Sequence, residues 1–160
     1  MIEIKEINKK FGKLEVLKNV NLSCKKGECI ALIGPNGCGK TTLIKSILGM
    51  VLPDKGSIEF NEKSILKEFL YRENIGYMPQ IGRYPDNMTI GQIIEMIKTI
   101  RNSNQELDEE LLKAFELDKM FDKQMRTLSG GTTQKVSAVL AFLFNPEVLI
   151  LDEPTAGLDP

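Results

Sequence analysis

The chain has 160 residues, of which 42% are hydrophobic and 27% charged, as in an ordinary soluble globular domain. Its formal net charge of −1 gives no sign of a protein that binds nucleic acid or a membrane surface. No apolar run approaches the roughly 18 residues of a membrane-spanning helix, and the first residues lack the features of a secretory signal. Three cysteines fit a reducing compartment. Cys24 and Cys29 could ligate a metal, but no further Cys or His completes a site, so we expect buried thiols there. These features favour a cytoplasmic protein.

Strands dominate the prediction for the first part of the chain. Turns are expected at residues 11–13 and 25–27, because glycine and lysine interrupt two stretches of apolar residues there. The pattern predicts a small antiparallel layer built on Ile2, Ile4, Ile7, Val16, Val20 and Leu22. Later strands are predicted over residues 57–60, after a turn at 53–56, and over residues 75–78, where Pro79 ends the strand.

The strongest local signal is the run Gly34-Pro35-Asn36-Gly37-Cys38-Gly39-Lys40-Thr41, which has the spacing of a phosphate-binding loop. An apolar run over 29–33, predicted to be a strand, precedes it, and a helix predicted over 40–50 follows it. The glycines let the backbone N–H groups turn toward phosphate oxygens, and the helix N-terminus adds its positive end. In such a loop Lys40 can reach the β- and γ-phosphates, and the Thr41 hydroxyl can ligate Mg²⁺.

Residues 85–145 look like a helical insert. Thr89-Ile90-Gly91-Gln92 is a capping box, with Met88 and Ile93 able to form its hydrophobic staple. One apolar helix face is then expected to contain Ile90, Ile93, Ile94, Ile97 and Ile100.

A second glycine-rich helix start follows at Leu128-Ser129-Gly130-Gly131-Thr132-Thr133-Gln134-Lys135. A serine and two glycines that open an apolar helix form another site for an anion. Taken alone, the segment is an ordinary capped helix start. Beside a complete phosphate loop, it would need a phosphate of its own, and the simplest source is a nucleotide held by another subunit.

The apolar run Val148-Leu149-Ile150-Leu151 ends in Asp152 and Glu153, and it predicts a strand buried on both faces. Acids at the carboxyl end of such a strand lie where open α/β sheets bind ligands. Asp152 is then placed to hold Mg²⁺, directly or through water, and Glu153 to orient or deprotonate an attacking water. The alternative is an ordinary strand end with solvated acids.

With these motifs in this order, the chain resembles the nucleotide-binding subunit of ATP-binding-cassette (ABC) proteins along its whole length. Residues 34–41 resemble the Walker A loop, Gln80 in Tyr77-Met78-Pro79-Gln80 the Q-loop glutamine, and 128–131 the signature motif. Residues 149–153 resemble Walker B, and Ala156-Gly157-Leu158-Asp159 the D-loop. The resemblance implies a P-loop NTPase fold, an α/β RecA-like core with an antiparallel β subdomain and a helical insert that carries the signature. The parts would be residues 1–84 (β subdomain and P-loop core), 85–145 (helical subdomain) and 146–160 (Walker B and D-loop).

The resemblance also implies roles for single residues. Phe11 lies where the family keeps an aromatic that stacks on adenine, and Thr42 extends the set of ATP-binding residues 34–41. Thr41, Gln80 and Asp152 would hold Mg²⁺, while Lys40, Gln80 and Glu153 would act in hydrolysis. Ser129, Gly130, Gly131 and the D-loop's Asp159 would face the ATP of the opposite subunit in a head-to-tail dimer. Cys38, where serine or alanine is common, adds a thiol that can be oxidised.

The implied function is the ATP-binding and ATP-hydrolysing subunit of an ABC transporter, which powers transmembrane permease subunits from the inner face of the cell membrane. The segment 81–88 would contact those subunits. Residues 128–160 look similar to ATPases of copper-processing and nitrous-oxide reductase maturation systems. The family's switch histidine follows the D-loop, whereas the chain has no histidine. We therefore expect the C-terminal part of the core to lie outside these residues and the 160 residues alone to hydrolyse ATP weakly.

Two alternatives compete with a transporter ATPase. A soluble ABC-type ATPase acting on ribosomes or DNA would usually carry a second cassette or a long coiled coil, and no sustained heptads occur between Lys40 and Leu128. A small-molecule kinase with a P-loop would leave the signature and the D-loop unexplained.

Overall fold

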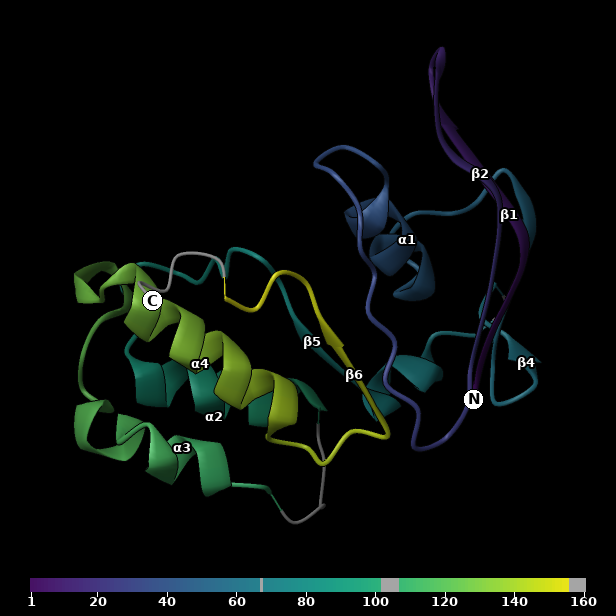
Figure 1. The fold of residues 1–160 in the computed structure, drawn as a ribbon. Coiled ribbons are helices and arrows are strands. Elements are labelled where there is room, and N and C mark those ends of the chain that lie inside the picture. Colours follow the sequence, from purple (N-terminus) through teal and green to yellow (C-terminus); the bar gives the residue numbers. More distant parts are fainter. Residues whose placement is uncertain (67, 102–106, 156–160) are drawn as a thin grey trace. The chain divides into compact units, whose positions relative to one another are not determined.

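The computed structural model describes residues 1–66, 68–101 and 107–155, which form parts of two compact units, Met1–Arg72 and Glu73–Pro160. Figure 1 shows the helices and strands of the two units. Within the described ranges, no helix is both long enough and apolar enough to cross a membrane.

The first unit is built on an antiparallel sheet with the strand order β2-β1-β3-β4. Its strands are β1 (Ile2–Phe11), β2 (Leu14–Cys24), β3 (Lys55–Phe60) and β4 (Lys63–Ser64). Ile4 of the central strand pairs with Leu22 on one side and Ile58 on the other, and its side chain is 1% exposed. The predicted antiparallel layer and its turn at residues 12–13 are therefore confirmed.

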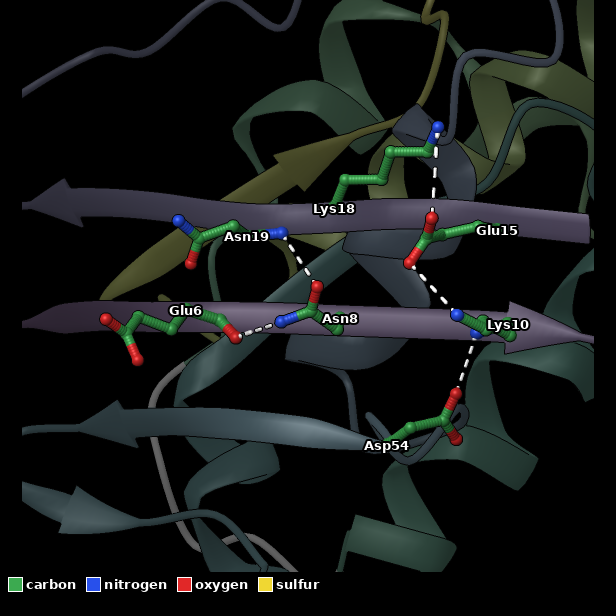
Figure 2. A network of polar contacts seen from close by, with 7 residues as sticks. All are labelled: Glu6, Asn8, Lys10, Glu15, Lys18, Asn19 and Asp54. Atoms are coloured by element: carbon green, nitrogen blue, oxygen red, sulfur yellow. Dashed lines mark hydrogen bonds and ion pairs between the residues drawn. The ribbon is translucent and has the colours of Figure 1, made fainter.

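Irregular pairing interrupts β1, and polar side chains cover the interruptions. Glu6 and Asn19 have positive φ angles of 51° and 47°, and the register shifts on both sides of Ile7. The Asn8 side chain donates to the Glu6 carbonyl (2.7 Å) and accepts from the Asn19 amide (3.0 Å) (Figure 2). These bonds satisfy backbone groups that the bulges remove from the ladder.

Asp54, the residue before β3, extends the same polar network from β1 to the start of β3. Its carboxylate accepts from the Lys10 amide at 2.7 Å (Figure 2). The carboxylate also accepts from the Lys9 ammonium at 2.9 Å, and the Asp54 amide donates to the Asn8 carbonyl at 2.8 Å. The Lys9 hydrogen bond, followed by the Lys10 amide, lowers the pKa of Asp54 below its ordinary value. The predicted turn at 53–56 thus leads into β3 through a charge-assisted contact.

Helix α1 (Lys40–Ile47) follows the glycine-rich loop, as predicted, and ends earlier than residue 50. Gly49, at φ 66°, forms the left-handed end of the helix. The buried Tyr71, in the short helix η1 (Leu70–Asn74), donates to the Ile47 carbonyl at 3.0 Å and packs on Phe60. These contacts hold the end of α1 against the first unit's core.

The predicted strand over 29–33 is wrong for this structure. Residues 29–33 belong to neither of the two described sheets, and Ile33 is 93% exposed. An apolar run has strand propensity, but a strand needs a hydrogen-bonded neighbour, and none of the described strands pairs with this run. Cys29 is exposed and Cys24 is half-buried, so the prediction of buried thiols at these two positions is also wrong; Cys38 is exposed as well.

The second unit contains two parallel strands, β5 (Ile75–Met78) and β6 (Val148–Leu151), paired from Ile75↔Val148 to Met78↔Leu151. Both strands were predicted. Burial on both faces of β6 was not confirmed, since Leu149 and Leu151 are 40% and 41% exposed. In the described residues β6 has one partner strand, so its side chains alternate between half-buried and exposed.

Helices form the rest of the second unit: α2 (Ile90–Arg101), α3 (Glu110–Ala114), η2 (Leu117–Met120), η3 (Met125–Thr127) and α4 (Gly130–Phe142). The predicted capping box is present, because the Thr89 amide donates to the Gln92 side chain and the Gln92 amide to the Thr89 hydroxyl. The predicted apolar face of α2 lines the core except at its end, where Ile100 is 70% exposed. The core residues of this unit are Ile90, Ile93, Ile94, Leu112, Leu117, Met125, Val136, Val139, Leu143 and Phe144.

Candidate functional site

The glycine-rich loop of the first unit has the backbone of a phosphate cradle. Gly37 and Gly39 have φ angles of 80° and 102°, and Gly39 caps α1 in the left-handed region. A Cβ on Gly39 would lie 2.9 Å from the Val16 carbonyl, and one on Gly34 would lie 2.7 Å from the Cys38 sulfur. Only glycine fits these positions without a shift of its neighbours, and the curl leaves amide groups for an anion. The loop therefore fits a phosphate group.

Lys40 and the two threonines after it open α1. The Lys40 ammonium donates to the carbonyls of Gly34 (2.7 Å) and Pro35 (3.1 Å), so the lysine side chain lies along the loop. Thr41 and Thr42 are half-buried in the first turn of α1, and this turn contains no acidic residue. A lysine beside a helix N-terminus concentrates positive charge where a phosphate would sit.

Phe11, the predicted adenine-stacking residue, ends β1 and is 50% exposed. The Lys9 ammonium lies 5.5 Å from the centre of its ring. Aromatic surface of this kind is available to a flat ligand. The first unit thus contains the predicted residues 11 and 34–42.

Three predicted residues of the second unit meet at one edge of the β5–β6 pair. The two strands are parallel and end together, and the Asp152 amide donates to the Met78 carbonyl at 2.9 Å. Gln80, two residues beyond β5, donates from its amide nitrogen to the Glu153 carboxylate at 2.6 Å. The sequence predicted both residues separately, and the structure places them in contact.

The two acids at this edge have different surroundings. Asp152 is 4% exposed, whereas Glu153 is exposed and has a positive φ of 50°. Burial, with the Asp152 carboxylate as the second cause, raises the pKa of Tyr77 on β5. A non-glycine residue in the left-handed region is uncommon and marks a constrained position, here the one predicted to orient water. Buried Asp152 and exposed Glu153 suit different tasks.

The predicted signature segment begins α4. Ser129 is the N-cap, and its hydroxyl oxygen accepts from the Thr132 amide at 3.2 Å. Gly130 and Gly131 occupy the first two helical positions, and a Cβ on Gly130 would meet open space. The helix start is therefore accessible at the position where a second phosphate is expected. Asp159 and the rest of the predicted D-loop lie outside the described residues.

Sequence reasoning missed two buried polar residues of α4. Gln134 is 7% exposed and donates to the Pro154 carbonyl at 3.4 Å, and Ser137 is 1% exposed and bonds the Tyr84 hydroxyl at 2.9 Å. A glutamine and a serine inside an apolar helix were the available signal, because buried polar groups almost always have partners. Within the described ranges, no group of three or more His, Cys, Asp or Glu side chains is placed to hold a metal ion.

The family model described as "ABC transporter" matches residues 17–156. The chain belongs to the ABC transporter family. It is 38% identical to the sulfate/thiosulfate import ATP-binding protein CysA of Pectobacterium atrosepticum, over 99% of this chain and 50% of that protein. The Fe(3+) ions import ATP-binding protein FbpC of Fusobacterium nucleatum is 36% identical, over 99% of this chain and 44% of that protein. The ABC transporter ATP-binding protein YtrB of Bacillus subtilis is 35% identical, over 99% of this chain and 54% of that protein.

Solved structures of ABC proteins share the fold. An ATP-binding subunit of an ABC transporter superposes with a TM-score of 0.89 at 32% identity, over 99% of this chain and 68% of that chain. A dimeric ATP-binding cassette in a post-hydrolysis state, bound to ADP and Pi, superposes with a TM-score of 0.86 at 28% identity, over 99% of this chain and 76% of that chain. The chain therefore has the P-loop NTPase fold expected of the family. It spans about half the length of the curated relatives it matches.

Proposed function

We propose that this chain is the ATP-binding and ATP-hydrolysing part of an ABC transporter subunit that drives permease partners from the inner face of the membrane. The observation that carries the proposal is the contact between Gln80 and Glu153 beside buried Asp152, in a chain that also has a left-handed glycine loop before Lys40 and Thr41. The relatives named as import ATP-binding proteins support the transporter over the soluble alternative.

Each residue has a task that its surroundings favour. The loop amides and Lys40 would bind the β- and γ-phosphates and offset their charge. The Thr41 hydroxyl and the Asp152 carboxylate are hard oxygen ligands of the kind that Mg²⁺ takes in nucleotide sites, where bound phosphates complete the set. Mg²⁺, when bound, would neutralise the charge that develops on the transferred phosphoryl group. Glu153 would orient the attacking water and accept its proton, and Gln80 would hold Glu153 in place.

Ser129, Gly130 and Gly131 are proposed to act on a second chain. Their amides and the Ser129 hydroxyl lie at a helix start within the second unit. Phosphate bound there would come from the nucleotide of an opposed ATPase subunit, which makes each site composite. The same proposal includes a domain division after residues 84 and 145. It also includes the role of Asp159 in the D-loop.

The cargo does not form part of the proposal. The relatives named above are called sulfate, thiosulfate and Fe(3+) importers, or carry no cargo in their name. They lend no support to the copper-processing and nitrous-oxide reductase maturation type that residues 128–160 suggested.

The test is hydrolysis of MgATP by the full-length protein with its partners. We expect Glu153→Gln to lower kcat by about 10²- to 10⁴-fold while leaving ATP binding intact, because it removes the general base and keeps the shape of the side chain. Lys40→Ala is the comparison variant and should weaken ATP binding itself. Full turnover by the Glu153→Gln protein, or no MgATP hydrolysis by the wild type, would contradict the proposal.

A further inference from the structure

One side of α4 is tied by polar contacts to the segments that carry Gln80 and Glu153. Ser137, 1% exposed, bonds the Tyr84 hydroxyl at 2.9 Å, four residues beyond Gln80. Gln134, one helical turn earlier, donates to the carbonyl of Pro154, the residue after Glu153. Both contacts lie inside the second unit, on the helix that Ser129 begins.

The backbone around Gln80 approaches α4 more closely than a side chain would allow. A Cβ on Gly82 would lie 2.2 Å from the Ser137 hydroxyl oxygen and 2.9 Å from a ring carbon of Tyr84. A Cβ on Gly76, in β5, would lie 2.0 Å from the Ala141 carbonyl. Glycine at these two positions lets β5 and the segment after it pack directly on the helix.

The hydrogen bonds have one consistent assignment. Ser137 donates its single hydroxyl hydrogen to the Thr133 carbonyl at 3.1 Å, so the Tyr84 hydroxyl must donate to the Ser137 oxygen. Burial raises the pKa of Tyr84, which keeps the phenol protonated. The Tyr84 ring also packs against the unit's hydrophobic core. Loss of the Tyr84 hydroxyl would leave the buried Ser137 oxygen without this donor, and loss of the Ser137 hydroxyl would leave the half-buried Tyr84 hydroxyl without this acceptor.

We propose that Tyr84 and Ser137 form a positioning pair that pins residues 80–84 to α4 and thereby holds Gln80 beside Glu153. The pair acts through Gln80, so both residues are positioning residues. Ser129 caps the N-terminus of α4. The same contact therefore links the helix that carries the proposed signature residues to the segment that carries Gln80. The inference rests on the proposed function for its effect on turnover, and on the described contacts alone for its effect on the backbone.

The test compares Tyr84→Phe, Ser137→Ala and the double variant in the full-length protein, by hydrogen exchange and by ATPase kinetics. Each variant keeps the packing and removes one hydroxyl. We expect exchange of the Asp152 amide, which donates to the Met78 carbonyl just before the pinned segment, to rise about two- to tenfold, with exchange in α2 unchanged. We expect kcat to fall by a similar factor with KM for MgATP unchanged, and the double variant to equal the single ones.

Tyr71→Phe is the matched control, because it also removes a tyrosine hydroxyl bond, from buried Tyr71 to the Ile47 carbonyl in the first unit. It should leave exchange of the Asp152 amide unchanged. Unchanged exchange of the Asp152 amide in Tyr84→Phe would overturn the proposal, and so would a rise spread evenly over α2 and α4, which indicates general destabilisation. Additive effects in the double variant would also overturn it. If the wild type hydrolyses no ATP, the proposed function fails, while the exchange experiment still decides whether the pair pins the segment.

Discussion

Gly39 is the residue at which the phosphate loop depends most on the absence of a side chain. Its φ is 102°, and a Cβ would lie 2.9 Å from the Val16 carbonyl. Gly12 is also left-handed, at 59°, but has open space around it. We expect Gly12→Ala to cost about 1 to 2 kcal/mol, the strain of a left-handed alanine. Gly39→Ala should cost more and should also abolish ATP binding. Urea unfolding and binding of a fluorescent ATP analogue would measure the two effects, and equal losses in both variants would contradict the prediction.

Asp54 should make the stability of the first unit depend on pH. Its pKa is lowered in the folded state, first by the Lys9 hydrogen bond and then by the Lys10 amide. The resulting stabilisation is fully present above the ordinary aspartate pKa of about 3.9 and is lost as the pH falls below it toward the folded-state pKa. Asp54→Asn should therefore be less stable than wild type at pH 7, with the difference shrinking below about pH 4. Urea unfolding at several pH values would test this, and a difference that stays constant with pH would exclude the mechanism.

Two helices of the second unit begin with similar caps but are predicted to differ in function. Thr89 caps α2 and Ser129 caps α4, and each side-chain oxygen accepts from the amide three residues later at 3.2 Å. Thr89→Ala and Ser129→Ala should each lower stability by about 1 kcal/mol. Only Ser129→Ala should also lower the ATPase rate of the full-length protein, since its hydroxyl is proposed to face a nucleotide. An equal loss of ATPase activity in both variants would reduce the role of Ser129 to that of a cap.

The proposed composite site makes a prediction for the whole molecule. If Ser129 binds the phosphate of an opposed subunit, a protein that binds ATP without hydrolysing it should accumulate as a dimer. We expect full-length Glu153→Gln to be dimeric with MgATP in sedimentation velocity and monomeric without nucleotide. Combining Glu153→Gln with Ser129→Arg should return it to monomer, because the new side chain blocks the helix start. A dimer that persists without nucleotide would point to a different interface.

Several elements followed from the sequence because their causes are local. The turn at Gly12, the helix after Gly39 and the capping box at Thr89 depend on backbone freedom and side-chain hydrogen bonds within a few residues. The order of motifs was enough to predict the family, which the comparisons confirmed. The individual site residues were also named from the motifs, and their roles remain proposals.

Tertiary structure decided the features that depend on partners distant in the sequence. The run 29–33 is apolar enough for a strand, but none of the described strands pairs with it. Strand β6 is half-exposed because it has one partner in the described residues. The contacts of Gln80 with Glu153 and of Tyr84 with Ser137 join residues 73 and 53 positions apart. Propensity and spacing describe what a segment can form, whereas packing determines which distant groups meet. The sequence by itself therefore determined the motifs and the family, and the fold brought Gln80, Glu153 and α4 together.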